Sequence, residues 1–585
     1  MVAGSLPPAA ASRHLVPLVE RAIQAHRHGA PETAEKLALE VLELAPDRPG
    51  ALSVLYEIRK AQGNRTAAEA LARRLVALDA NNFPATNELA LLLLNKGDLA
   101  EAEVHARNAV RIAPENAQSH NLMGMILTEA QRPQIGEYHY RKALELSGAR
   151  DAILLANLAW NLKNQGRMEE SRTLYEESFA AAPAVRQTLL GWARMEEADR
   201  NFERAAELLD KLEAIAPDDV GMKVSRAVVL GRQKKPAEAV AVLDALAHTR
   251  EGARLGPAEL LEKGRLLDSL GDYEAAGQAF IEGKKLTREL SGQHYLDQHA
   301  NQLMARLKGF FTQGRLRLLP RAGVRTDVPQ PLFILGFPRS GTTLVEQTLS
   351  AHPMIAAGDE LPLINDLTQM MPRMLNSPLA YPEALAELWM ADQRDGLDRL
   401  RDNYLARARQ MGVVRDEAPW FTDKMPLNET HLGLIALLFP ASPLVHVIRH
   451  PLDVMVSAIS NLFTHGLYCG HALETAATHY VRVMELVEHY RTEMSLKYLP
   501  VRYEDMVADQ ETTVRALLGF VGLDWHAGCL AFHENRRYAR TASYAQVTEK
   551  LYDRSVGRWR HYRSVLEPAI PILAPLMEKL GYSAE

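Results

Sequence analysis

The sequence predicts a two-domain protein, in which an all-helical solenoid is followed by an α/β domain with a central parallel sheet. A repeat of about 34 residues fills the N-terminal half, and stacked helix pairs produce periods of this length. In the C-terminal half, the apolar run at 332–335 leads through a glycine-bounded turn into a helical pattern. A second apolar run at 443–448 is also followed by a turn and a helix. Strands that alternate with helices in this way form parallel sheets covered on both faces.

The composition is that of a globular protein with more than one hydrophobic core. A chain of 585 residues exceeds the size at which single cores stop growing, so we expect two or more domains. Hydrophobic residues make up 47% of the chain and charged residues 24%, which excludes a disordered or fibrous protein. The formal net charge of −6 argues against a nucleic-acid-binding protein, so we expect no nucleic acid among its partners.

The cysteine content and the hydropathy of the sequence indicate the cellular compartment of the protein. Cys469 and Cys529 are far apart and in no ligand spacing, so we expect neither a disulfide framework nor a metal site. The first residues lack the charged start and apolar core of a secretory signal. No uninterrupted apolar run reaches the roughly 18 residues that span a bilayer. These observations predict a cytoplasmic protein without a membrane span.

The helical repeat is recognised from turns and small residues that recur at a fixed spacing. Each unit holds two amphipathic helices, and stacking the units buries their apolar faces in one continuous core. Small residues in the second helix of a unit let neighbouring helices approach closely. Successive turns lie 34, 34, 34, 35 and 34 residues apart, at Pro46, Ala80, Pro114, Gly148, Pro183 and Pro217. The small residues are Ala68, Ala102, Ala205, Ala239 and Ala276.

This pattern resembles the tetratricopeptide repeat over residues 15–290, with the best match at 264–280. The resemblance implies a scaffold whose concave face binds a peptide or protein, and the sequence does not show which side chains would do so. We therefore expect a protein or peptide partner at the repeats. Residues 291–327 form a basic connector with glycine and proline, where we expect a linker. The second domain is then expected at 328–585.

A glycine-bounded loop between a strand and a helix predicts a site for a phosphate group. The apolar strand ends at Gly336, and helical periodicity begins after Gly341. Backbone N–H groups at the start of a helix and the helix dipole both favour an anion. The loop resembles Walker A, but Thr342 stands in place of the Walker A lysine and Arg339 supplies the positive charge. The residues expected to contact the anion are Pro338, Arg339, Ser340, Gly341, Thr342 and Thr343.

A second pair of residues points to the same anion. Arg449 follows the apolar strand at 443–448, and open α/β sheets bind ligands at the carboxyl ends of their strands. Ser457 comes eight residues later, on the following helix, where its hydroxyl can reach the same group. A salt-bridged arginine and a solvent-facing serine would explain the pair equally well in isolation. The glycine-bounded loop about 110 residues earlier favours a shared nucleotide.

The P-R-S-G-T-T form of the loop and the Arg449–Ser457 pair resemble the sulfotransferases that use 3′-phosphoadenosine-5′-phosphosulfate (PAPS). Over 328–585 the chain is most similar to their tyrosylprotein sulfotransferase-like branch. The resemblance implies a P-loop-like α/β sulfotransferase domain whose loop holds the 5′-phosphosulfate. It implies that Arg449 and Ser457 hold the 3′-phosphate, and that 3′,5′-bisphosphoadenosine (PAP) is the product. No metal is needed, since positive side chains and backbone dipoles neutralise the leaving group.

The same resemblance assigns catalytic roles. The branch carries G-E-E after the loop, with the last glutamate as the base, and Gly358, Asp359 and Glu360 take this place here. It therefore implies that Glu360 removes the proton of the acceptor hydroxyl, as a carboxylate can. Lys424 falls on the family's lysine and, with Arg339, would stabilise the charge on the leaving group.

Later motifs of the family imply three further contacts to the nucleotide. Tyr503, in the segment VRYEDMV, would pack against the adenine ring. Ser543 and Arg558 match a serine and a lysine of the branch at the corresponding separation. Arg558 keeps the positive charge of that lysine and so its contact to a phosphate.

The acceptor and two rival functions stay open. The repeats favour a protein tyrosine presented to the site, while a carbohydrate or small-molecule hydroxyl would undergo the same chemistry. A P-loop kinase or NTPase would also use a glycine-bounded loop, but the missing loop lysine speaks against it. A protein whose repeats act only as a scaffold, and whose C-terminal half is inactive, would have the same fold but would catalyse no reaction.

Overall fold

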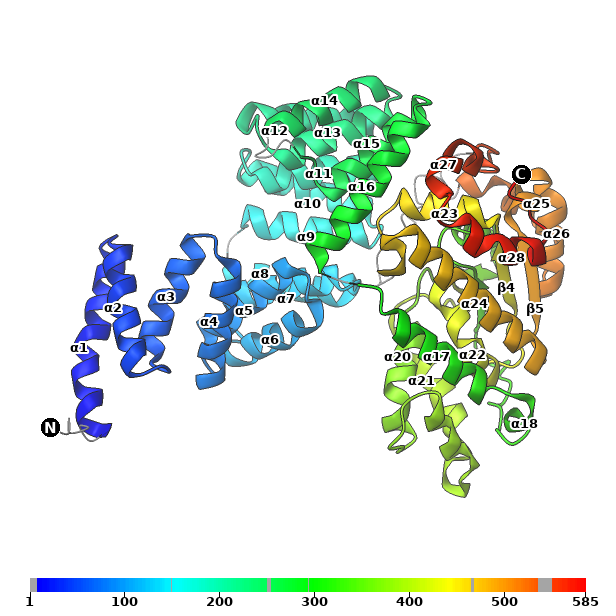
Figure 1. Cartoon of the computed structure of the whole chain (residues 1–585), viewed down its shortest axis with the longest axis horizontal. Helices are drawn as coiled ribbons and strands as arrows, with labels where there is room; N and C mark the ends of the chain where they lie inside the picture. The colour runs from blue at the N-terminus through cyan, green and yellow to red at the C-terminus, as the bar shows by residue number, and fades with distance from the viewer. Residues whose placement is uncertain (1–7, 149, 250–253, 293, 464–467, 535–549) are drawn as a thin grey trace. The chain divides into compact units, whose positions relative to one another are not determined.

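The computed structural model of the chain divides into two compact units, Met1–Ser225 and Arg226–Glu585. An all-helical region precedes a domain with a parallel sheet (Figure 1), which confirms the predicted fold class. No helix in the part of the chain that the structure describes is long and apolar enough to cross a bilayer. The described residues are 8–148, 150–249, 254–292, 294–463, 468–534 and 550–585.

Helix pairs build the first unit, and from the first helix to the twelfth each helix packs against the next one along the chain. Several helices begin at an Asn or Asp, such as Asn64 and Asp98, whose side-chain oxygen accepts an N–H of the first turn. The predicted small residues Ala102 and Ala205 are fully buried, which confirms the close approach of the helices. The helices are α1 (Pro8–Arg27), α2 (Pro31–Leu44), α3 (Pro49–Ala61), α4 (Arg65–Leu78), α5 (Phe83–Lys96), α6 (Leu99–Ile112), α7 (Ala117–Glu129), α8 (Pro133–Ser147), α9 (Ala152–Asn164), α10 (Met168–Ala181), α11 (Arg186–Ala198), α12 (Phe202–Ile215) and α13 (Val220–Arg232), which extends into the second unit.

The last helices of the repeat region belong to the second unit. Phe280 of the final repeat helix joins Leu452 and Trp559 in a buried apolar cluster. The segment predicted as a linker also contains a helix, in which Leu307 and Phe310 recur at helical spacing and are buried in the core. These helices are α14 (Pro236–Thr249), α15 (Pro257–Ser269), α16 (Tyr273–Ser291), α17 (Asp297–Phe310) and α18 (Gln313–Leu316).

A parallel sheet of five strands, counted over the described residues, forms the centre of the second unit. The strand order is β2-β3-β1-β4-β5, so the first strand lies in the middle with later strands on both sides. This is the arrangement that places a ligand crevice beside the central strand, at the carboxyl edge. The strands are β1 (Gln330–Leu335), β2 (Ile355–Ala356), β3 (Trp420–Asp423), β4 (Leu444–Ile448) and β5 (Tyr498–Arg502).

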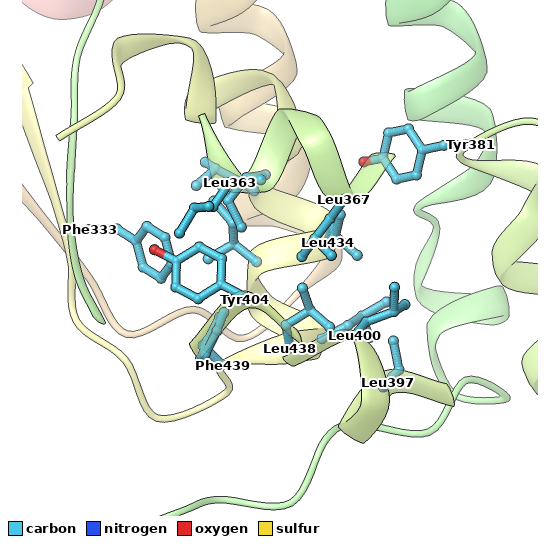
Figure 2. Packing of buried hydrophobic residues seen from close by; sticks show 14 of the residues in the cluster. Phe333, Leu363, Leu367, Tyr381, Leu397, Leu400, Tyr404, Leu434, Leu438 and Phe439 are labelled. Atoms are coloured by element: carbon cyan, nitrogen blue, oxygen red, sulfur yellow. The ribbon is translucent and has the colours of Figure 1, made fainter. Parts of the chain in front are cut away.

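Helices cover both faces of the sheet. Phe333 of β1 belongs to one buried cluster and Ile334 to another, because successive side chains of a strand point to opposite faces. Figure 2 shows the first cluster, where the Phe333 ring lies 5.7 Å from that of Phe439 and 6.3 Å from that of Tyr404. Burial on both faces explains why the strand reads as an uninterrupted apolar run.

Short helices and 3₁₀ segments complete the second unit. The α-helices are α19 (Thr342–Ser350), α20 (Leu363–Met374), α21 (Gly396–Gln410), α22 (Leu432–Leu438), α23 (Pro451–Ile459), α24 (Leu473–Glu493), α25 (Tyr503–Ala508), α26 (Gln510–Val521), α27 (Arg563–Leu566) and α28 (Ile570–Leu580). The 3₁₀ segments are η1 (Glu383–Trp389), η2 (Ala391–Gln393), η3 (Pro426–His431), η4 (Tyr468–His471), η5 (Ala527–Glu534) and η6 (Arg558–Tyr562).

Candidate active site

Predicted site residues follow the carboxyl end of every strand of the sheet. The loop at 336–341 follows β1, Glu360 follows β2 and Lys424 follows β3. Arg449 follows β4, and Tyr503 follows β5. Because the strands are parallel, these ends share one edge, and residues far apart in sequence meet there.

The loop between β1 and α19 requires glycine at both ends. Gly336 has a φ of +148° and Gly341 a φ of +107°, conformations that residues with a Cβ avoid. A Cβ on Gly336 would lie 2.7 Å from the carbonyl oxygen of Val447 in β4. A Cβ on Gly341 would lie 2.5 Å from the Tyr503 ring. The loop therefore packs directly against β4 and the residue after β5.

Polar groups at the loop are buried. Ser340, Thr342 and Thr343 are 1%, 5% and 6% exposed, and Pro338 is half-buried. The two threonines begin α19, whose first N–H groups and dipole favour an anion. Among the described residues, the Ser340 hydroxyl has no hydrogen-bond partner. A buried hydroxyl of this kind costs free energy, which an oxygen of a bound ligand would offset.

Two arginines and a serine lie together beside the loop. Arg339 Nε donates a hydrogen bond to Ser457 Oγ at 2.9 Å. Arg449 Nη1 donates to the carbonyl oxygen of Arg339 at 3.1 Å, and Nη2 donates to the carbonyl of Ser555. The Arg449 guanidinium also lies 4.6 Å from the centre of the Tyr503 ring. The predicted pair Arg449 and Ser457 is thus brought to the loop, with Arg339 between them.

Positive charge accumulates in this cluster. Desolvation and, second, the neighbouring Arg449 lower the pKa of Arg339 to about 10. Arg265 of α15 contributes to the same decrease. The hydrogen bonds of Arg449 run to carbonyl groups, which do not neutralise its charge, and among the described residues its Nε has no hydrogen-bond partner. Repulsion among desolvated cations is relieved when an anion binds between them, so the cluster has the electrostatics of a polyanion site.

A carboxylate and an amine face each other after β2 and β3. Lys424 Nζ lies 2.8 Å from Glu360 Oε1, and the Lys424 side chain is fully buried while that of Glu360 is 21% exposed. The Lys424 N–H donates to the carbonyl oxygen of Asp359 at 2.9 Å, which ties the two segments together. A Cβ on Gly358 would lie 1.9 Å from the carbonyl oxygen of Thr422, so the chain reversal before Glu360 requires glycine. The predicted base and the predicted lysine therefore form one unit.

Carboxylates keep Lys424 protonated. Burial acts to lower its pKa, but Glu360, Glu346 and Asp359 outweigh burial, and the pKa lies above the ordinary lysine value. A charged donor with a fixed position is suited to stabilise negative charge that develops on a nearby oxygen.

Glu346 of α19 is a positioning residue that sequence reasoning missed. Its Oε1 accepts the N–H of Asp359 at 2.9 Å and the hydroxyl of Thr422 at 2.6 Å. The Thr422 hydroxyl in turn accepts the N–H of Gly358 at 2.8 Å. The network joins the helix after the loop to the segment that carries Glu360. Only three of the nine residues in 342–350 are apolar, so no sequence signal marks Glu346 as buried.

Asp423 is a second missed residue, and it immediately precedes Lys424. Its Oδ2 accepts the Tyr404 hydroxyl at 2.6 Å, and Oδ1 accepts from Asn428 at 3.0 Å and from the N–H of Met425 at 3.2 Å. Burial raises the pKa of Asp423 to about 7 despite these hydrogen bonds. The carboxyl group fixes the turn that directs Lys424 toward Glu360.

Two further predicted residues are Ser543 and Arg558. Ser543 lies outside the described residues. Arg558, in η6, forms an ion pair with Asp268 of α15 at 2.9 Å, and its guanidinium lies 5.4 Å from the Tyr562 ring. In this structure Asp268 therefore balances the charge of Arg558, and the contact of Arg558 to a phosphate stays a prediction.

Comparison with known families gives a different match in each half of the chain. Residues 331–527 match the sulfotransferase family. This match begins in β1 and extends past β5, so it contains the whole sheet and the loop. Residues 58–117 and 156–220 match the tetratricopeptide repeat.

Individual relatives are more distant. An uncharacterized protein of Aquifex aeolicus (strain VF5) is 29% identical over 396 residues, which cover 65% of this chain and 49%, or about half, of that protein's own length. Protein-tyrosine sulfotransferase 1 of Rattus norvegicus is 28% identical over 313 residues, or 49% of this chain and 82% of the relative. The solved sulfotransferase domain of the Synechococcus PCC 7002 olefin synthase is 21% identical, with a TM-score of 0.31, and covers 46% of this chain and 99% of that structure. The N-terminal half of this chain thus carries tetratricopeptide repeats, and its C-terminal half is a domain of the sulfotransferase family.

Proposed function

We propose that this protein transfers a sulfuryl group from PAPS to the hydroxyl group of a protein tyrosine. The sulfotransferase-family domain and the sulfotransferase relatives support the transfer of a sulfuryl group. One observation carries the proposal for the donor. The cationic cluster of Arg339, Arg449 and Ser457 and the Glu360–Lys424 pair lie at the same sheet edge, around one glycine-bounded loop.

The residues at this edge fit PAPS. The loop amides and the buried Ser340 hydroxyl suit the 5′-phosphosulfate, and Arg449 with Ser457 suits the 3′-phosphate. The ring of Tyr503, which packs against Gly341, offers a flat apolar surface for adenine. PAPS supplies an activated sulfuryl group that is joined through oxygen to the 5′-phosphate.

In the proposed reaction, Glu360 accepts the proton of the acceptor hydroxyl while the oxygen forms a bond to sulfur. The bond between sulfur and the 5′-phosphate oxygen breaks, and its electron pair leaves with PAP. Lys424 and Arg339 stabilise the negative charge on that leaving oxygen. Lys424 also orients the Glu360 carboxylate through their contact at 2.8 Å. The protein contributes mainly position and electrostatics.

Three observations favour a tyrosine in a protein or peptide as the acceptor. Relatives from Rattus norvegicus and Danio rerio are named protein-tyrosine sulfotransferases. Tetratricopeptide repeats in the same chain provide extended surfaces of the kind that bind peptides. The partly exposed carboxylate of Glu360 leaves the base accessible to a large acceptor.

Calorimetric titration of the full chain with PAP and with ATP tests the donor site. We expect PAP to bind more tightly than ATP, and Arg449→Ala to weaken PAP binding by about 10- to 100-fold, as loss of a charged hydrogen bond does. Arg502→Ala is a matched control, because Arg502 ends β5 and lies 4.6 Å from the Tyr582 ring in the same manner. Absent PAP binding, or ATP binding that Arg449→Ala leaves intact, would overturn the proposal in favour of a kinase or NTPase.

A transfer assay with radiolabelled PAPS tests the acceptor. Tyrosine-containing peptides are compared with the same peptides carrying phenylalanine, and with a panel of sugars and small phenols. We expect label to appear on the tyrosine peptides and to be absent from the phenylalanine peptides. Labelled sugars or small phenols together with unlabelled peptides would contradict the tyrosine acceptor and leave the donor assignment intact.

A further inference from the structure

The last repeat holds the end of the helix that carries Ser457. α23 ends at Ile459, with Ser460 as its C-terminal cap. Arg265 of α15 donates to the Ser460 carbonyl oxygen at 3.1 Å, and Lys284 of α16 donates to the Asn461 carbonyl oxygen at 2.5 Å. The C-terminus of a helix leaves carbonyl groups without partners and carries partial negative charge, so two cations are favourable there.

Hydrogen bonds continue from this contact into the proposed donor site. Asn461 Nδ2 donates to the carbonyl oxygen of Ser457 at 2.8 Å. The Ser457 hydroxyl accepts from Arg339 Nε at 2.9 Å. A continuous chain therefore runs from Lys284 through Asn461 and Ser457 to Arg339, which links α16 to the glycine-bounded loop.

Lys284 is an unusual residue for a repeat helix. It is 2% exposed, and its amine lies 4.7 Å from the centre of the Phe463 ring. Burial lowers the pKa of Lys284 to about 7, and repulsion from Arg339 adds to the decrease, while Cys469 opposes it. A lysine that only stabilised the repeat would be expected on the surface, as its neighbour Lys285 is.

We propose that Lys284 and Arg265 are positioning residues for the 3′-phosphate site, which they control by fixing the C-terminal turn of α23. Ser457 is in this turn, so a loose turn would misplace its hydroxyl. The last repeat is then part of the donor site and not only a surface for partners. The inference rests on the proposed function, because it assumes that PAP binds at this edge.

Titration of the full chain with PAP and with adenosine 5′-monophosphate separates positioning from general stability, since only PAP carries the 3′-phosphate. We expect Lys284→Met to weaken PAP binding by about tenfold and to change binding of the monophosphate by less than about twofold. Lys285→Met is the matched control on the same helix, because Lys285 is 54% exposed and pairs with Glu282 at 3.8 Å. This control should leave both affinities unchanged.

Arg265→Met provides a second test if Lys284→Met does not fold. The Arg265 side chain is 43% exposed, although its ion-pair partner Glu262 is only 9% exposed, and the variant should reduce PAP binding in the same selective manner. A PAP affinity equal to that of the wild type in either variant would overturn the inference. An equal loss of affinity for PAP and for the monophosphate would overturn it as well. A wild-type chain that binds no PAP would instead overturn the proposed function, and the inference with it.

Discussion

Glu360 combines a partly exposed side chain with a fixed orientation. One carboxylate oxygen contacts the buried Lys424, while 21% of the side chain remains accessible. The preceding residue, Asp359, is held by its backbone: its N–H donates to Glu346, and its carbonyl oxygen accepts from the N–H of Lys424. This arrangement suits a base that meets its substrate at the surface of a rigid site.

Replacement of Glu360 by glutamine tests this role. The amide keeps the shape and can still accept from Lys424, but it cannot take a proton. We expect sulfuryl transfer to fall by about 10²- to 10⁴-fold, with PAP affinity nearly unchanged. Asp366→Asn, at a surface ion pair with Arg407 on the same unit, should retain full activity. Transfer assays and titrations on both variants check the prediction, and an active Glu360→Gln enzyme would exclude the residue as the base.

Two buried lysines show how neighbours set the pKa of the same side chain. Lys424 has carboxylates around it, and its pKa lies above the ordinary value. Lys284 has an aromatic ring and an arginine near it, and burial brings its pKa down to about 7. The first is suited to meet developing negative charge, and the second donates to a carbonyl group just after α23.

Asp423 makes stability depend on pH. Burial raises its folded-state pKa to about 7, above the value of about 3.9 expected in the unfolded chain. Its contribution to stability is therefore complete below about pH 4 and is lost as the pH rises toward 7. In the wild type, we expect this effect to lower the free energy of unfolding by on the order of 2–3 kcal/mol between pH 5 and pH 8. We expect Asp423→Asn to abolish this decrease. Thermal melting at several pH values should show a flatter profile for the variant than for the wild type.

A surface acid provides the control for this pH effect. Asp416 is paired with Arg409, which lowers its pKa below the ordinary value, so it does not titrate between pH 5 and pH 8. Asp416→Asn should leave the shape of the melting profile unchanged. A steep profile in Asp423→Asn, equal to that of the wild type, would show that other groups cause the dependence.

At the scale of elements, the loop depends on backbone conformation more than on side chains. Its glycines let the chain pass between β4 and Tyr503, where a methyl group would collide. The loop then ends at the N-terminus of α19, where the first turn and the helix dipole favour an anion. In the proposed donor site, strand, loop and helix would together form the anion-binding element.

Gly341→Ala tests this element. The Cβ would lie 2.5 Å from the Tyr503 ring at a φ of +107°, so we expect PAP affinity to fall by at least about tenfold and stability by about 1–3 kcal/mol. Gly519→Ala, in α26 with no atom within 4 Å of the new Cβ, is the matched control and should be neutral or stabilising. Titration with PAP and thermal melting measure both effects. Normal PAP binding by Gly341→Ala would mean that the loop is not the anion site.

At the scale of the whole molecule, the last repeat and the sulfotransferase domain form one compact unit. Phe280 of α16 lies in the same buried cluster as Leu452 of α23. Asp268 of α15 pairs with Arg558, and Tyr562 also donates to its carboxylate. The family match to the sulfotransferase begins only at residue 331, so the folded unit is larger than the matched segment.

Truncation tests this division. A fragment of residues 218–585 keeps α13 to α16, and we expect it to fold and to bind PAP with the affinity of the full chain. A fragment of residues 292–585 exposes the apolar cluster that α16 covers, and we expect it to melt at least about 5 °C lower or to aggregate. Thermal melting and PAP titration of both fragments check this. Equal stability of the two fragments would show that the last repeat is dispensable.

The sequence by itself determined the helical repeat, the parallel sheet and the loop, because each depends on local patterns. The 34-residue spacing of turns, the apolar runs and the glycines of the loop are all visible within short windows. The same patterns placed Arg449 and Ser457 near the loop, since parallel strands bring their carboxyl ends to one edge. The helix α17 in the predicted linker was missed, because its apolar spacing was outweighed by neighbouring glycines and prolines.

Only the tertiary structure decided which charged residues face one another. Glu346 supports the segment of Glu360, Lys284 holds the end of α23, and Arg558 pairs with Asp268. The partners Lys284 and Asn461 are 177 positions apart, and Arg558 and Asp268 are 290 apart. A local pattern can predict that a polar side chain is buried, but its partner is set by how helices and strands pack, because a hydrogen bond depends on distance in space and not on distance along the chain.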